Sequence, residues 1–196
     1  MSDIKSALEI AMEKVGKLDE ATDEERLEWK YVPQGEQLAA RYLKKGCNLI
    51  AELSQHQESV RKHVIQGAAK ILISNISLPR NDVAKKNNRG TMDGLKSLKS
   101  DKVNTENVYS KIRYLFNHYT EQGEQQRQEA YQSLKDEFAT KMQQAIQQQL
   151  GPLTGMNIDV GKQPQFQQEW RRIQTQLDSQ YLNLLGEYKR ELSDIA

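Results

Sequence analysis

Cysteine is nearly absent from this chain of 196 residues, which contains only Cys47. The sequence therefore forms no intramolecular disulfide, and it offers neither a CxxC redox pair nor a cysteine zinc site. No stretch approaches 18 apolar residues, so no membrane-spanning helix is predicted. The first twenty residues also lack the charged start, apolar run and cleavage site of a signal peptide. These absences predict a protein that stays in the reducing cytoplasm.

An excess of charge of either sign is also missing. Lysine and arginine total 28 against 27 aspartates and glutamates, which gives a formal net charge of +1. A chain so balanced produces no overall field that attracts nucleic acid or anionic lipid. Any basic function must therefore be local.

The motifs of the common enzyme classes are missing as well. The sequence contains no GxGxxG, no P-loop and no GxSxG, and Cys47 has no histidine within sequence reach. The three histidines, His56, His63 and His118, do not follow the spacing of zinc or di-iron sites. The sequence thus predicts no catalytic, cofactor-binding or metal-binding residue, and we interpret the protein as a non-enzyme.

Proline is scarce too, and residues 104–150 contain none. Asn104 is a suitable N-cap for a helix there, and Gly151 followed by Pro152 is a typical helix end. A helix of this length measures about 70 Å, which requires other helices along its sides. Its weakest point is predicted at Gly123, where the apolar stripe also lapses.

A second strong helix is predicted at 164–194, within the segment 164–196. Its apolar seam recurs at an average of about 3.67 residues, which indicates a nearly straight helix. The seam consists of Phe166, Trp170, Ile173, Leu177, Tyr181, Leu184, Tyr188, Leu192 and Ile195. If this helix folds back from the end of the central one, Trp170 pairs with Gln144 or Ala145, and Ile195 pairs with Tyr119.

The first 32 residues are predicted to hold two short helices that dock on a larger bundle. An amphipathic pattern favours a helix at 3–17, and the capping-box spacing of Thr22 and Glu25 favours another at 22–31. Val32-Pro33 is expected to end the second helix, because the residue before proline avoids the helical region.

Apolar positions at helical spacing then predict one long helix at 34–76, within the segment 33–76. The following residues, 77–103, contain Pro79, Gly90, Gly94 and adjacent asparagines. Such residues break helices, so we expect a flexible connection with at most two short helical turns.

Basic residues accumulate in that connection. Seven of them face three acids, a local excess of four; they are Arg80, Lys85, Lys86, Arg89, Lys96, Lys99 and Lys102. They suggest binding to nucleic acid or another polyanion. A solvated linker is the simpler interpretation, because no aromatic residue lies between them to stack on bases.

The loop at 151–163 is longer than a turn between two helices requires. Its apolar residues are Leu153, Met156, Ile158 and Val160. We expect them either to fold back over the neighbouring helix ends, which is the preferred interpretation, or to remain exposed as a docking site for a partner.

Together these patterns predict an all-α protein. The expected architecture is a single elongated domain, 1–196, built as an antiparallel bundle or coiled-coil-like rod of three long helices and two short N-terminal ones. We hypothesise a cytoplasmic scaffold or adaptor that binds a protein partner or a second copy of itself, without a cofactor or membrane. The alternative hypothesis is weak polyanion binding through the basic connection.

Overall fold

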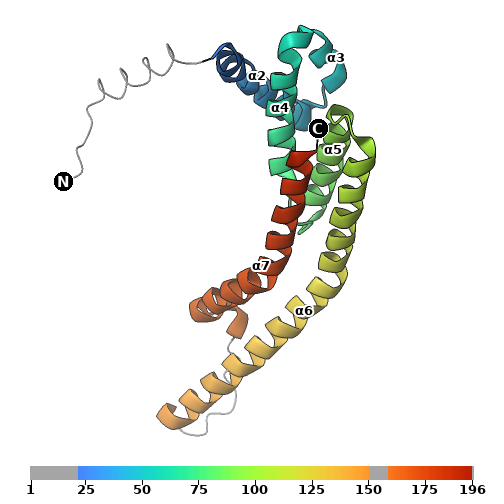
Figure 1. Ribbon diagram of the computed structural model, residues 1–196. Coiled ribbons are helices and arrows are strands. Elements are labelled where there is room, and N and C mark those ends of the chain that lie inside the picture. The colour runs from blue at the N-terminus through green and yellow to red at the C-terminus, as the bar shows by residue number, and fades with distance from the viewer. Residues whose placement is uncertain (1–21, 151–158, 196) are drawn as a thin grey trace, which may run out of the picture. The chain divides into compact units, whose positions relative to one another are not determined.

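The computed structural model describes residues 22–150 and 159–195 of the chain, and every regular element in them is helical (Figure 1). The all-α prediction is therefore confirmed. The helix expected at 3–17 lies outside the described residues. The elements are α2 (Asp23–Lys45), α3 (Leu49–Ser54), α4 (Glu58–Asn75), α5 (Asp82–Leu98), α6 (Lys102–Leu150), the 3-10 turn η1 (Val160–Lys162) and α7 (Pro164–Asp194).

These elements form two compact units. The N-terminal unit contains the described residues of 22–76, 86–102 and 195, and the hairpin unit contains those of 77–85, 103–150 and 159–194. The single domain and the rod-like bundle stay predictions.

Helix α2 begins as the sequence predicts and ends later than predicted. Thr22 and Glu25 form the expected capping box, in which the Thr22 amide donates to the Glu25 carboxylate over 2.8 Å. The break predicted at Val32-Pro33 is wrong, because Pro33 lies inside α2. A proline there removes one backbone hydrogen bond, and close packing of this part of α2 on α4 offsets that loss.

The prediction of one long helix within 33–76 is also wrong, because this segment contains the end of α2 and the whole of α3 and α4. Gly46 ends α2 with a φ of 71°, a left-handed conformation that glycine adopts without strain. Asn48 then caps α3 by accepting hydrogen bonds from two backbone amides, and α4 starts after Gln57. The apolar spacing continues through Gly46, but the left-handed backbone of this residue ends the helix there.

Helices α2 and α4 touch backbone to backbone. A Cβ atom added to Gly35 would lie 2.0 Å from the carbonyl oxygen of Val64, and one added to Gly67 would lie 2.0 Å from that of Val32. The helices can approach this closely only because neither glycine has a side chain. The crossing buries Leu38 and other apolar residues of both helices.

Helix α5 occupies most of the segment predicted as a flexible connection, 77–103, and corrects that prediction. Its buried face consists of Asn88, Thr91, Met92, Leu95 and Leu98, among others. Because Asn88 and Thr91 are polar, the apolar residues alone do not show the helical spacing of this face. Gly94 is a contact rather than a helix break, because its missing side chain makes room for the ring of Tyr42. The Tyr42 hydroxyl also donates to the carbonyl of Gly90 over 2.9 Å.

Helices α6 and α7 form an antiparallel hairpin and confirm the two helices predicted at 104–150 and 164–194. Helix α6 runs without a break through Gly123. The predicted register is wrong, however: Tyr119 lies opposite Asp178, and Tyr131 stacks on Trp170. Trp170 was expected opposite Gln144 or Ala145, about fourteen residues further along α6.

The register differs because α7 begins beside the middle of α6 rather than at its end. Val160 in η1 is buried with Leu134 and Phe166, and Phe138 meets Phe166 edge to face with ring centroids 5.5 Å apart. Part of the connecting loop therefore packs against the hairpin. The C-terminal part of α6 continues past the start of α7 (Figure 1).

Candidate functional site

A cleft of about 670 Å³ lies between the helices of the hairpin unit. Four cationic side chains and two acidic ones line it, which leaves a local surplus of two positive charges. The lining residues are Pro79, Arg80, Lys85, Tyr119, Thr120, Glu124, Arg127, Arg171, Gln174, Thr175, Asp178 and Leu182.

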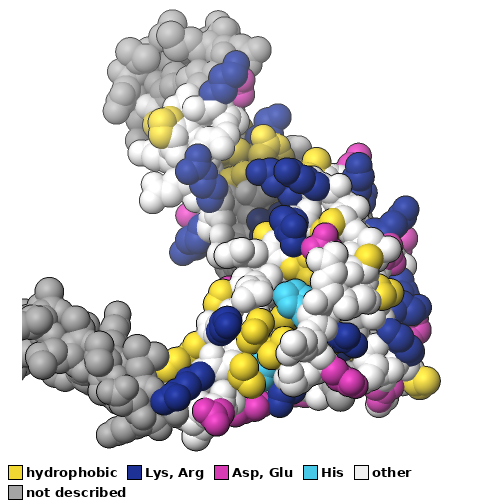
Figure 2. Space-filling view, turned by 90° about the horizontal axis from the view of Figure 1, so that it is seen from above, with side chains coloured by type: hydrophobic (Ala, Val, Ile, Leu, Met, Phe, Trp, Pro, Cys, Tyr) yellow, Lys and Arg dark blue, Asp and Glu magenta, His cyan; other side chains and the backbone are white. Residues whose placement is uncertain are grey.

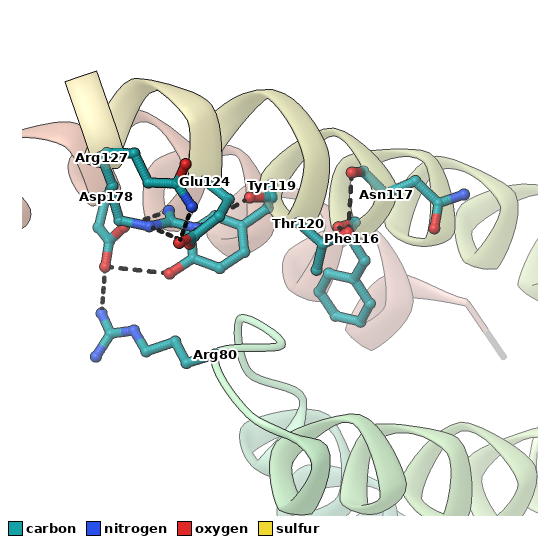
Figure 3. Close-up of polar contacts among 9 residues, drawn as sticks. Arg80, Phe116, Asn117, Tyr119, Thr120, Glu124, Arg127 and Asp178 are labelled. Carbon is teal, nitrogen blue, oxygen red and sulfur yellow. Dashed lines mark hydrogen bonds and ion pairs between the residues drawn. The ribbon is translucent and has the colours of Figure 1, made fainter.

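Asp178 on α7 is the buried centre of this cleft, with a side chain only 8% exposed. Its Oδ2 atom accepts a hydrogen bond of 2.7 Å from Arg80 and one of 3.5 Å from the Tyr119 hydroxyl. Figure 3 shows the three side chains converging from α7, from the segment before α5 and from α6. Asp178 therefore fixes the position of a cation that is itself 58% exposed.

Arg127 on α6 is the second buried charge, with a side chain 13% exposed. Its Nη2 atom donates to the Tyr119 carbonyl over 3.2 Å and to Glu124 over 2.8 Å, while Nε donates to Glu124 over 3.2 Å. The guanidinium carbon lies 4.3 Å from the centroid of the Tyr119 ring, in cation–π geometry. The Nη1 atom comes within 3.6 Å of Asp178 Oδ1, an ion pair too long for a hydrogen bond.

These contacts shift the pKa values of two neighbouring groups. Burial raises the pKa of the Tyr119 phenol, and the negative charge of Asp178 raises it further, against the opposing charges of Arg127 and Arg80. The hydrogen bonds from Arg127 lower the pKa of the Glu124 carboxyl. At neutral pH, the cleft thus contains a neutral phenol and an ionised Glu124.

Arg171 and Lys85 carry the remaining positive charge of the cleft. Among the described residues, the Arg171 guanidinium has no hydrogen-bond or ion-pair partner. Within residues 22–150 and 159–195, the Lys85 side chain pairs with Asp82 alone, over 3.3 Å, and Asp82 is 98% exposed. A pair so exposed is weak, so both cations are available to a ligand.

A second polar contact borders the cleft along the hairpin. His118 Nδ1 lies 2.9 Å from the hydroxyl of Tyr181, whose ring meets that of Tyr119 edge to face at 5.1 Å. The polar lapse in the apolar stripe of α6 falls here, and Gly123 leaves space for Tyr181 and Arg127. The interruption of the apolar stripe near Gly123 thus reflects polar packing between the two helices, and α6 has no break there.

The structure divides the seven basic residues predicted for polyanion binding. Arg80 and Lys85 join the cleft, whereas the others belong to the N-terminal unit. Of these, Lys86 and Arg89 are exposed on α5. Lys99 is 7% exposed and donates to the carbonyl of Ile195, which argues against a contact from Lys99 to phosphate. Lys96 is exposed, and its carbonyl accepts a hydrogen bond from the exposed Lys102.

The predicted partner-binding residues of the loop are only partly described. Leu153, Met156 and Ile158 lie outside the described residues. Val160 is 7% exposed and packs in the cluster of Leu134 and Phe166. For Val160, the fold-back interpretation is therefore confirmed.

The sequence reasoning missed the main residues of the cleft: Tyr119 as a polar partner, Arg127, Arg171 and Asp178. Each lies on a predicted helix, but their meeting depends on the helix register, which the sequence did not reveal. One available signal was the interruption of the apolar stripe of α6 near Gly123. Where the packing face of one helix becomes polar, the helix that packs against it must supply polar partners. Asp178 is next to the predicted seam residue Leu177.

The described residues contain neither a metal site nor a membrane-spanning helix. No group of three or more histidine, cysteine, aspartate or glutamate side chains within them is arranged to hold a metal ion. Their helices do not combine the length and hydrophobicity needed to cross a bilayer. Figure 2 shows basic and acidic side chains interspersed among the described residues that face the viewer.

Comparison with known proteins gave one match. No curated protein and no solved structure is significantly similar to the chain. A family model matches residues 50–194, which include the whole hairpin unit and its cleft. The chain therefore belongs to DUF6657, a family of unknown function.

Proposed function

We propose that the protein is a non-enzymatic binding protein of the cytoplasm and that its cleft holds an anionic group of the ligand. The observation that carries this proposal is the Arg171 guanidinium, which has no partner among the described residues, at a cleft with a surplus of two positive charges. Cytoplasmic action agrees with a chain whose one cysteine, Cys47, is a free thiol.

The chemistry of the cleft suits this role. Asp178 and Glu124 are matched by Arg80 and Arg127, so their negative charges do not repel an incoming anion strongly. Arginine binds phosphate and carboxylate groups through two parallel hydrogen bonds, and no described residue occupies the Arg171 guanidinium. A volume of about 670 Å³ lies within the range of small-molecule sites.

Calorimetric titration with methyl phosphate tests the proposal. Arg171→Gln removes the free guanidinium and is expected to weaken binding about five- to tenfold, the effect of about 1–1.5 kcal/mol. Arg172→Gln is the matched control, because Arg172 is the adjacent residue, does not line the cleft and pairs with Glu169 over 3.0 Å. Absent binding, or equal loss in both variants, would refute the proposal.

A second candidate function is the scaffold or adaptor role, which one feature of α6 favours. Val103 and Tyr114 are 72% and 74% exposed, and both belong to the hairpin unit. They are eleven residues apart, close to three helical turns, so they lie on one face of α6. Exposed apolar side chains aligned in this way suit contact with a second copy of the chain.

Self-association is measured by light scattering after size-exclusion chromatography. The proposal expects a dimer that the double variant Val103→Ser with Tyr114→Ser converts to monomer. Val83→Ser is the control, since Val83 is 68% exposed but lies outside α6. A wild-type monomer at all concentrations would contradict the self-association proposal and leave the anion proposal untouched.

A further inference from the structure

Segment 77–85, which ends in the first turn of α5, supplies two of the four cations of the cleft. These are Arg80 and Lys85, whereas Arg127 and Arg171 come from α6 and α7. The segment belongs to the same compact unit as the two helices of the hairpin. The positive surplus of the cleft therefore depends on how this segment is held against the hairpin.

An ion pair between Arg80 and Asp178 fastens the segment to α7. The Arg80 side chain is 58% exposed, so without a partner it would sample many rotamers. Asp178 is buried, and its Oδ2 atom accepts a charge-assisted hydrogen bond of 2.7 Å from Arg80 (Figure 3). The neighbouring Pro79 is buried and lines the same cleft. A guanidinium held in this way is preorganised, which lowers the entropic cost of binding an anion.

Asp178 is thus an acid that favours an anionic ligand. Its own charge repels an anion, but it holds Arg80, and the segment that Arg80 anchors also carries Lys85. If Asp178 and both of these cations left the cleft, two cations would face one acid, a surplus of one instead of two. Charge alone predicts the opposite, because removing an acid while every cation stays in place strengthens the attraction for an anion.

We propose that Arg80 is a second anion-binding residue of the cleft and that Asp178 is the positioning residue that holds it there. This inference rests on the proposed anion-binding function. It adds one residue that contacts the anion and one that acts through it.

A cycle of variants of the full chain tests the inference by titration calorimetry with methyl phosphate. Arg80→Gln should weaken binding about five- to tenfold, because one charged hydrogen-bond donor is lost. Asp178→Ala should also weaken binding, by about threefold or more, although it removes a negative charge. In the Arg80→Gln background, Asp178→Ala should instead strengthen binding, because only its repulsion of the anion is left. A purely structural role of Asp178 predicts weaker binding in both backgrounds.

Arg89→Gln is the matched control for Arg80→Gln. Arg89 is exposed on α5 and does not line the cleft, so the loss of its charge should leave the affinity for methyl phosphate unchanged. Equal weakening by the two variants would overturn the inference, because the phosphate would then respond to the general charge of the chain.

The Nε–H resonance of Arg80 reports the contact directly. Methyl phosphate should shift this signal in the wild-type chain. In Asp178→Ala the Arg80 signal should stay in place while the Arg171 signal still shifts. A thermal melt checks that Asp178→Ala folds, and if it does not, the wild-type spectrum and the Arg80→Gln titration still decide the question.

The outcomes separate the two proposals. Unchanged affinity in Arg80→Gln, or tighter binding by Asp178→Ala in the wild-type background, would overturn the inference and leave anion binding at Arg171 standing. A wild-type chain that does not bind methyl phosphate would overturn both.

Discussion

Gly67 lies at the close crossing of α2 and α4, and replacing it with alanine should separate the two helices. The new Cβ would lie 2.0 Å from the carbonyl oxygen of Val32, where ordinary contacts begin at 3.4 Å. The helices must therefore move apart by about 1 Å or more. Overpacking of this kind costs up to about 3 kcal/mol, and the higher helix propensity of alanine offsets about 1 kcal/mol. We expect Gly67→Ala to lower the free energy of unfolding by about 2 kcal/mol.

Thermal unfolding followed by circular dichroism measures this loss. For a chain of this size, 2 kcal/mol corresponds to a decrease in Tm of about 4–8 °C. Gly90→Ala is the matched control, because a Cβ there meets nothing within 4 Å and Gly90 also lies within a helix. It should raise the stability by about 0.5–1 kcal/mol.

The reciprocal glycine provides a second check. Gly35→Ala should destabilise the unit as Gly67→Ala does, and the double variant should lose less than the sum, because one separation of the helices relieves both clashes. If Gly67→Ala and Gly90→Ala gave the same Tm, the close crossing of α2 and α4 would be refuted.

Three further predictions concern the hairpin unit. Phe166→Ala should cost about 3–5 kcal/mol, because Phe166 is fully buried, whereas Leu184→Ala at a 36% exposed position should cost far less; urea unfolding compares them. The raised pKa of Tyr119 favours its neutral form in the folded state, so its contribution to stability is complete below pH 10 and is lost as the pH rises through the folded-state pKa. Burial also raises the pKa of Tyr42 and Tyr181, so absorbance at 295 nm should show one late-ionising phenol fewer in Tyr119→Phe, and an unchanged titration would contradict the assignment. Glu124 has a lowered pKa, so its pairing with Arg127 stabilises the protein above pH 4.5 and is lost as the pH falls through the folded-state pKa. Glu124→Gln should therefore flatten the decrease in Tm between neutral and acid pH, and an unaltered slope would exclude this contribution.

The sequence predicted those elements whose signals are local. The capping box at Thr22 and the helix end at Leu150 were read correctly because each depends on a few neighbouring residues. Long-range packing decided the rest. Pro33 remains helical where α2 packs closely on α4, and Gly94 in α5 leaves room for the Tyr42 ring; no local pattern reveals either contact.

The candidate site shows the same division. Arg80 and Lys85 were recognised as basic residues from composition. The other charged residues of the cleft, such as Arg127 and Asp178, come from helices whose pairing depends on where the loop places Val160. A register error of about fourteen residues was enough to hide the cleft. The polar interval in the apolar stripe of α6 at Gly123 was the one local signal of the cleft in the sequence.

Anion binding at Arg171 is the central claim, and the side-chain Nε–H resonances of the arginines test it most directly. In a ¹H–¹⁵N spectrum of the labelled chain, titration with methyl phosphate should shift the Arg171 signal saturably, and the Arg171→Gln variant identifies that signal by its absence. The signal of Arg172, which pairs with Glu169 outside the cleft, should stay in place. An immobile Arg171 signal, or shifts of equal size at both arginines, would contradict binding in the cleft.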